Sequence, residues 1–149
     1  MADHRAEQIM DAIQTLLTGL TTTGTNVTRD RVYPIGTSIN YALSLYQGSD
    51  DPASRDDQSW NILNSFLAFR IDIQVRLSSS TVISQQLNLI RKEIVFALQA
   101  NPTLSLSFVV DLIEGSALEP VDDYGDQPIS RQSFHWTVHY ERSRTDPSA

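Results

Sequence analysis

Three aspartates lie close together in the stretch VDDYGDQP, residues 121–128, and carboxylates at this spacing could bind Ca²⁺. They are Asp122, Asp123 and Asp126. A calcium loop needs oxygen ligands at its first, third and fifth positions, Gly at the sixth and Glu at the twelfth. Counted from Asp122, the third position is Tyr124, Gly125 comes fourth, and no Glu closes the loop. Asp and Gly are also common between antiparallel strands, so we expect an exposed hairpin tip without a dedicated ion.

Two histidines, His135 and His139, have the spacing of a metal pair on a helix. The residues around them alternate as in a strand, where side chains four positions apart share a face but are separated by roughly 13 Å. One ion therefore cannot bind both. We expect both histidines on the polar face of the last strand, and we expect the protein to have no metal ion and no cofactor.

The sequence contains no signature of a known catalytic site. No HExxH, GxSxG or glycine-rich phosphate loop occurs in it. The sequence contains the His and Ser residues that a catalytic triad needs. However, the predicted strands and helices place no Ser at a sharp strand-to-helix turn near a His. The absence of Cys excludes disulfides, thiolate metal sites and Cys nucleophiles. We therefore expect that the protein is not an enzyme.

Hydrophobic periodicity predicts the elements that position these residues. Apolar residues three and four apart predict helices at about 3–20 and 80–100. Alternating apolar residues predict four strands, at about 39–47, 66–78, 106–119 and 129–142. This order predicts an α+β fold with a four- to five-stranded, mainly antiparallel sheet and two helices packed on one face.

The length of 149 residues fits a single domain that spans 1–149. Stretches rich in Gly, Pro, Ser and Asp, at about 48–61 and 121–128, lack periodicity, and we expect them to be mobile loops. The last residues, about 143–149, are polar and include a proline, so we expect a C-terminal tail there.

The overall composition, 40% hydrophobic and 19% charged, is ordinary for a soluble globular protein. Eleven basic and eighteen acidic residues leave a formal charge of −7, which works against nucleic-acid binding across a broad surface. No apolar run approaches the ~18 residues of a membrane span, and the first residues lack an apolar signal core. We expect a soluble intracellular protein that does not bind membranes.

Several charged residues are predicted on exposed sheet faces. Arg70 and Arg76 flank Asp72 on the polar face of the strand at 66–78, and cross-strand ion pairs there are ordinarily worth under ~1 kcal/mol each. They are surface charges unless another chain covers them. On grounds of exposure alone, the residues we expect at assembly interfaces, either between subunits or with other proteins, are Arg70, Arg76, Asp122, Asp123, Asp126 and Arg131.

Six segments, taken in order along the chain, have the pattern of one protein family. The first three are MADHRAEQIMDAIQTLLTGL, RVYPI and INYALSLYQGSDD. The others are FRIDIQVRL, LNLIRKEIVFAL and GSALEPVDDYGDQPISRQSFHWTVHYERS, which ends in a strand with Val138 and Tyr140. Together they resemble the tail terminator proteins of long-tailed bacteriophages, the family of the minor tail protein U of phage lambda. The resemblance spans nearly the whole chain.

The resemblance implies a structural virion protein that carries out no chemistry. In that family a compact α+β subunit forms a hexameric ring on the finished tail tube, stops its polymerisation and provides the surface for head attachment. The implied partners are further copies of the chain, the tail tube protein and a head–tail neck or connector protein, while DNA passes through the lumen without specific binding. The implied location is the head-proximal end of the tail in the virion, after assembly in the host cytoplasm.

Two other functions stay open beside this one. A head–tail neck or connector component can have a similar fold, and a small-ligand-binding α+β domain or enzyme is the alternative outside virion proteins. In a ring, the aspartates of each tip would bring many like charges together, so the tips should repel each other unless basic groups or counter-ions meet them. On that basis salt or divalent ions should favour the ring.

Overall fold

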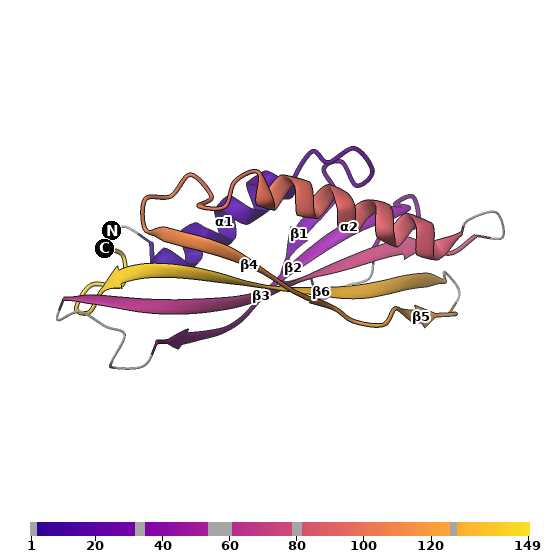
Figure 1. The fold of residues 1–149 in the computed structure, drawn as a ribbon. Coiled ribbons are helices and arrows are strands. Elements are labelled where there is room, and N and C mark those ends of the chain that lie inside the picture. The colour runs from indigo at the N-terminus through magenta and orange to yellow at the C-terminus, as the bar shows by residue number, and fades with distance from the viewer. Residues whose placement is uncertain (1–2, 32–34, 54–60, 79–81, 126–127) are drawn as a thin grey trace.

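The computed structural model describes residues 3–31, 35–53, 61–78, 82–125 and 128–149. Within these residues the chain forms two helices and six strands (Figure 1). In chain order they are α1 (Arg5–Leu17), β1 (Val27–Arg29), β2 (Tyr41–Pro52), β3 (Ile62–Arg76), α2 (Ile83–Gln99), β4 (Val109–Ala117), β5 (Val121–Asp123) and β6 (Ile129–Ser143). The α+β class predicted from the sequence is confirmed.

The strands form one open sheet in the order β1-β2-β3-β6-β4. β5 pairs with the first residues of β6, whose other edge is occupied by β3. All pairs are antiparallel except β1 with β2. The described sheet therefore has six strands where the sequence predicts four to five. β1 and β5 account for the difference, because strands of three residues are too short to show alternation.

Both helices lie on the same face of the sheet, as the sequence predicts (Figure 1). Their buried residues recur every three or four positions, which places them in one stripe toward the strands. The stripe of α1 is Ile9, Met10, Ile13 and Leu17, and that of α2 is Leu87, Ile90, Ile94 and Leu98. Alternate residues of β3 and β6, including Phe69, Ile71, Phe134 and Trp136, complete the core. Each such side chain contributes about 1.5–3 kcal/mol through burial.

The strand predicted at 39–47 is longer in the structure. β2 continues to Pro52, after a register shift between Gln47 and Asp50. Gly48 permits this, since a Cβ there would come 3.0 Å from the carbonyl oxygen of Ala68. The first part of the stretch 48–61 is therefore strand and not loop. Its residues 54–60, like residues 126–127 of the stretch 121–128, lie outside the described ranges.

The face of the sheet opposite the helices, called the back face below, is partly covered by residues 35–40. The Arg76 guanidinium donates hydrogen bonds to the carbonyl oxygens of Ile39, at 3.0 Å, and Gly36, at 2.6 Å. Asp72 and Gln74, on the same face of β3 as Arg76, are buried. Alternation alone predicts both as exposed, and Asp72 is accordingly not the surface charge expected from the sequence.

β4 forms one edge of the sheet. Its pairing with β6 shifts register twice, between Val109 and Asp111 and between Glu114 and Ala117. Gly115 lies at the second shift, where a Cβ would come within 2.6 Å of the carbonyl oxygen of His135. Such bulges bend a strand away from a regular ladder.

The residues predicted as a polar tail contact α1. The backbone N–H of Arg5 donates to the carbonyl oxygen of Pro147 at 2.9 Å, and the N–H of Ser143 donates to the carbonyl oxygen of Ala149. The two ends of the chain consequently lie side by side (Figure 1). Among the described residues, neither helix is long and apolar enough to span a membrane.

Candidate assembly surfaces

Arg70, one of the expected interface residues, has two partners in its own chain. Its Nε lies 3.2 Å from Oδ1 of Asp72, and its guanidinium lies 4.3 Å from the ring centroid of Tyr46. Ser133 donates a second hydrogen bond, of 2.7 Å, to the same Asp72 oxygen. Arg70 is half-exposed and Asp72 is buried, so the arginine closes the back face over a buried carboxylate.

The other expected residues do not form a single site. Arg76 holds the segment 35–40, as described above. Arg131 is exposed on the back face, opposite Gln74 of β3 and Val121 of β5. Asp122 and Asp123 belong to β5 and pair with the first residues of β6. Asp126 lies outside the described residues. Of the six, Arg131, Asp122 and Asp123 thus lie at one end of the sheet. Arg76 lies at the same end, because it pairs with Ile129 of β6, which pairs with Asp123 on its other side, whereas Arg70 lies farther along β3.

The two histidines share one half-buried face of β6, as predicted. His139 stacks on Phe66 with ring centroids 4.6 Å apart, and its Nε2 lies 3.1 Å from Oδ1 of Asn64. His135 lies opposite Arg70 of β3. In the described part of the chain, no group of three or more His, Cys, Asp or Glu side chains is arranged to hold a metal ion.

Exposed apolar and acidic side chains gather at the β5 end of the sheet, on both of its faces. The apolar members are Leu118, Val121 and Tyr124, with exposed fractions of 51%, 62% and 76%. The acidic members are Glu119, Asp122 and Asp123, all exposed. We call these six residues the tip patch. An aromatic side chain as exposed as Tyr124 is uncommon on a monomer and typical of a contact surface.

Hydrogen bonds within the tip patch keep it negatively charged. Tyr124 donates from its hydroxyl to Oδ2 of Asp122 at 2.9 Å. Hydrogen bonding with Ser130 and then with Tyr124 lowers the pKa of Asp122, and the same carboxylate raises the pKa of Tyr124. The backbone N–H of Gly125 donates to Oδ1 of Asp123 at 3.1 Å. Asp122 and Asp123 are adjacent in β5 and pair with Ser130 and Ile129 of β6, so their side chains point to opposite faces of the sheet.

A second exposed surface lies on the outer side of α2. Leu89 and Phe96 are seven residues apart, which is two helical turns, so they point the same way; their exposed fractions are 42% and 67%. A shallow groove of about 400 Å³ beside them is lined by Asn88, Arg91, Lys92, Val95 and Phe96. These five residues and Leu89 form the helix patch. The predictions from the sequence do not include this surface, although Val82, Leu89 and Phe96 recur every seven residues, the spacing of side chains on one side of a helix.

The helix patch is basic. The charged residues of α2 are Arg91, Lys92 and Glu93. Glu93 accepts hydrogen bonds from the backbone N–H and the hydroxyl of Thr22, at 3.2 and 2.9 Å, and therefore faces the turn after α1. Lys92 and Arg91 each lie near an aromatic ring, that of Phe96 at 5.9 Å and that of Phe134 at 5.2 Å. The Nε atom of Arg91 is buried and has no hydrogen-bond partner among the described residues.

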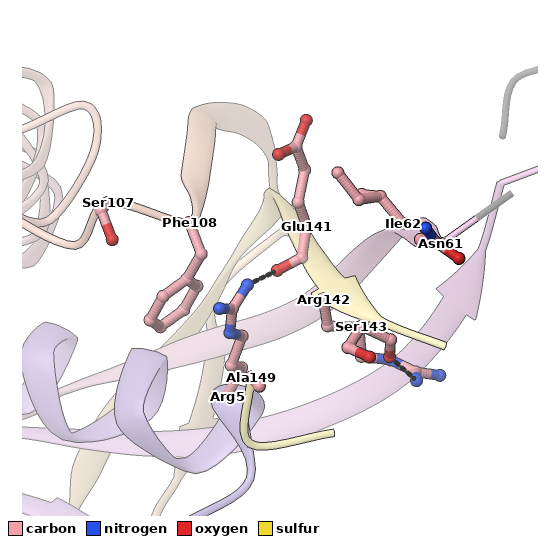
Figure 2. A pocket seen from close by; sticks show the side chains of 9 residues that line it. All are labelled: Arg5, Asn61, Ile62, Ser107, Phe108, Glu141, Arg142, Ser143 and Ala149. Atoms are coloured by element: carbon pink, nitrogen blue, oxygen red, sulfur yellow. Dashed lines mark hydrogen bonds between the residues drawn. The ribbon is translucent and has the colours of Figure 1, made fainter. Parts of the chain in front are cut away.

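A second groove, of about 430 Å³, lies where the chain ends meet (Figure 2). In it the Arg5 guanidinium lies 4.4 Å from the ring centroid of Phe108 and donates to the carbonyl oxygen of Glu141. The Glu141 carboxylate points away from Arg5 (Figure 2). Because both contacts of Arg5 are internal, we assign this arginine the structural role of joining α1 to the end of β6.

Comparisons with known proteins give likenesses to solved structures but no match in sequence. No family model matches the chain, and no curated protein matches its sequence. Among solved structures, a chain from the virion of a native gene transfer agent particle is similar, with 16% sequence identity and a TM-score of 0.48, over 93% of this chain and 92% of that chain. A likeness at this level carries no conclusion about function.

Proposed function

We propose that the protein is a structural virion protein of the tail terminator type. Copies of the chain form a ring, a hexamer as in the family that the sequence resembles, on the end of a finished tail tube. The ring stops polymerisation of the tube and offers its opposite side to the head-side neck or connector. DNA passes through the lumen, and no catalytic step is involved.

The observation that carries this proposal is the presence of two exposed apolar patches of opposite charge on separate elements. The tip patch belongs to the β4–β5 end of the sheet, and the helix patch to α2. A subunit of a closed ring needs two different contact surfaces, because a heterologous interface joins unlike patches of neighbouring copies. The α+β fold also agrees with the compact α+β subunit that the resemblance implies.

The oligomeric state tests the first part of the proposal. We expect purified protein to sediment as a discrete oligomer in analytical ultracentrifugation and to appear as rings of tail-tube width in electron micrographs. A monomer at all concentrations, with a melting temperature raised by a small molecule, would instead support the ligand-binding alternative.

The step at which assembly stops tests the second part. In a phage lacking this protein, we expect tails of uncontrolled length that fail to join heads. Tails of normal length that fail to join heads would indicate the neck or connector function. Complementation with the wild-type gene is the control, since it should restore both length control and joining.

A further inference from the structure

We propose that the outer side of α2 in one copy packs against the back face of the next copy, and that this is the contact between neighbouring subunits. This inference rests on the proposed function in one respect, namely that the partner is a second copy of this chain. The α2 side of the contact is the helix patch. The other side is a separate acidic surface on the back face, formed by residues of β2, β3, β6 and β4.

The first row of this surface crosses four strands of the sheet. Phe66 of β3 pairs with Asp51 of β2 on one side and with His139 of β6 on the other. On its far side His139 pairs with Asp111 of β4. Both aspartates are exposed, and both rings are half-buried. Because the rings of Phe66 and His139 stack on each other, the row is an aromatic pair with a carboxylate at each end.

The next row continues the surface with Thr137 of β6 and Ile113 of β4, which pair with each other. Ile113 has an exposed fraction of 43%. Val138, between Thr137 and His139, is buried toward the helices, so the side chains on either side of it point to the back face. We call this surface the back-face patch, and its members are Asp51, Phe66, Asp111, Ile113, Thr137 and His139.

The charges of the two patches are opposite. The back-face patch carries Asp51 and Asp111, and Arg70 of the same face is engaged within its own chain. The helix patch carries Arg91 and Lys92, of which Lys92 is exposed. Opposite charges orient two surfaces during encounter and disfavour pairing of like patches. The helix patch is therefore a better partner for the back-face patch than a second back-face patch is.

The dimensions of the two patches also agree. Leu89 and Phe96 are seven residues apart on α2, which corresponds to about 10.5 Å at 1.5 Å per residue. The three strand spacings between Asp51 and Asp111 correspond to about 14 Å at ~4.8 Å each. α2 can therefore lie across the strands with both apolar side chains between the two aspartates. Lys92, which lies between Leu89 and Phe96 on the helix, is then close to a carboxylate.

The two patches of one chain face opposite directions. Leu89 and Phe96 lie outside the buried stripe of α2 and point away from the sheet. The back-face patch lies on the side of the sheet opposite the helices (Figure 1). One chain cannot make this contact with itself, so it must join two copies. Because the patches differ, the contact is heterologous and propagates from copy to copy until a ring closes.

This contact changes the expected effect of salt. If repulsion between aspartates dominated, salt would favour the ring, as expected from the sequence. In the proposed contact a lysine meets a carboxylate of the neighbour, so added sodium chloride screens an attraction and weakens association. Sedimentation across a salt series measures the sign without any mutation, and association that strengthens with added salt would contradict the contact.

Charge reversal tests the contact directly. Lys92→Glu alters the helix patch and Asp111→Lys alters the back-face patch, both at exposed positions. We expect each variant alone to weaken self-association by about tenfold or more, because the contact then brings like charges together. A chain with both substitutions should recover association, since each contact again joins opposite charges. The matched controls, Arg144→Glu and Asp3→Lys, make the same changes of charge at other exposed sites and should assemble like the wild type.

Cross-linking gives a second measurement that changes no charge. The chain contains no Cys, so Leu89→Cys and Ile113→Cys introduce single thiols at exposed positions. We expect a short bismaleimide to join these two variants in a mixture and not to join either variant to itself. Circular dichroism and urea unfolding check the fold of every variant, above all Asp111→Lys, which removes a hydrogen bond accepted from the N–H of Leu112.

The outcomes separate the docking proposal from the proposed function. If both single charge variants assemble like the wild type, the docking proposal is wrong while the ring stands. The same holds if the doubly substituted chain associates no better than the single variants, or if the two thiol variants do not cross-link in a mixture. If the wild type itself never associates, both the docking proposal and the ring are overturned.

Discussion

The Tyr140 hydroxyl donates a hydrogen bond of 2.6 Å to Oδ2 of Asp50, which joins β6 to the outer part of β2 across the intervening strand β3. Tyr140 is fully buried at the end of the core. Asp50 lies in the part of β2 that follows the register shift. This hydrogen bond explains why a stretch with loop-like composition continues as a strand.

Replacing Tyr140 by Phe removes this hydrogen bond and keeps the ring. A hydrogen bond to a charged acceptor is worth about 1.5–3 kcal/mol. We expect Tyr140→Phe to lower the free energy of unfolding by about 1–2 kcal/mol, measured by urea denaturation at neutral pH. Tyr124→Phe, which changes an exposed hydroxyl, is the matched control and should have little effect. An unchanged stability of Tyr140→Phe would contradict a role for this contact.

The same residue predicts a dependence on alkaline pH. Burial, followed by the hydrogen bond to Asp50, raises the pKa of Tyr140 well above its ordinary value of 10.0. A raised pKa in the folded state means that the stabilisation is complete below pH 10 and falls as the pH rises above it, because the unfolded chain ionises first. We expect stability above pH 10 to fall more steeply for the wild type than for Tyr140→Phe. Parallel pH profiles of the two proteins would refute this.

Arg70 forms an ion pair with Asp72, whose side chain is buried. Removal of the arginine leaves the Asp72 carboxylate buried without its cationic partner. We expect Arg70→Met to lower the free energy of unfolding by about 1–2 kcal/mol. This loss is smaller than that expected on breaking a fully buried ion pair, because Arg70 is half-exposed and solvent screens its charge. The same substitution should cost less in a chain that already carries Asp72→Asn. Equal costs in the two backgrounds, measured by thermal and urea unfolding, would show that the pair is not coupled.

Gly115 tests the bulge in β4. A Cβ at this position would meet the backbone oxygen of His135 at 2.6 Å, and backbone cannot move away as a flexible side chain does. We expect Gly115→Ala to destabilise the protein by about 1–3 kcal/mol. Gly36→Ala is the matched control, because the nearest atom to its Cβ would be a side-chain carbon of Ile39 at 3.8 Å. Equal melting temperatures for the two variants would contradict the prediction.

Periodicity predicted the long elements of this fold because each buries one continuous face. The alternation from Leu67 to Val75 and the helical spacing of Leu87, Ile90, Ile94 and Leu98 both correspond to core residues. The short strands β1 and β5 do not show such patterns, since three residues are too few for alternation to be recognised. Asp72 was predicted as exposed because alternation cannot show that the polar face of β3 is itself buried, as Asp72 and Gln74 are in the structure.

The candidate surfaces were predicted in part. The acidic tip was visible in the sequence because its three aspartates are adjacent or nearly so, and Asp122 and Asp123 are exposed in the structure. Its apolar members, Leu118, Val121 and Tyr124, were not predicted as a surface, because an apolar residue next to a strand is normally assigned to the core. The helix patch was not predicted for the same reason, since apolar residues such as Leu89 and Phe96 are normally assigned to the core. The structure shows that they are exposed and lie outside the buried stripe of α2.

The two register shifts in β4 have a consequence for behaviour at high concentration. An edge strand with free backbone N–H and C=O groups can template the strands of other molecules and so lead to aggregation. β4 exposes Val110 and Ile113, which would favour such growth, but its bulges interrupt the ladder and Asp111 and Glu114 place charges along the edge. The β4 edge is thereby protected against the addition of strands from further molecules without limit. In the ring proposed above, the contacts between copies would then be made by side chains and not by this strand edge.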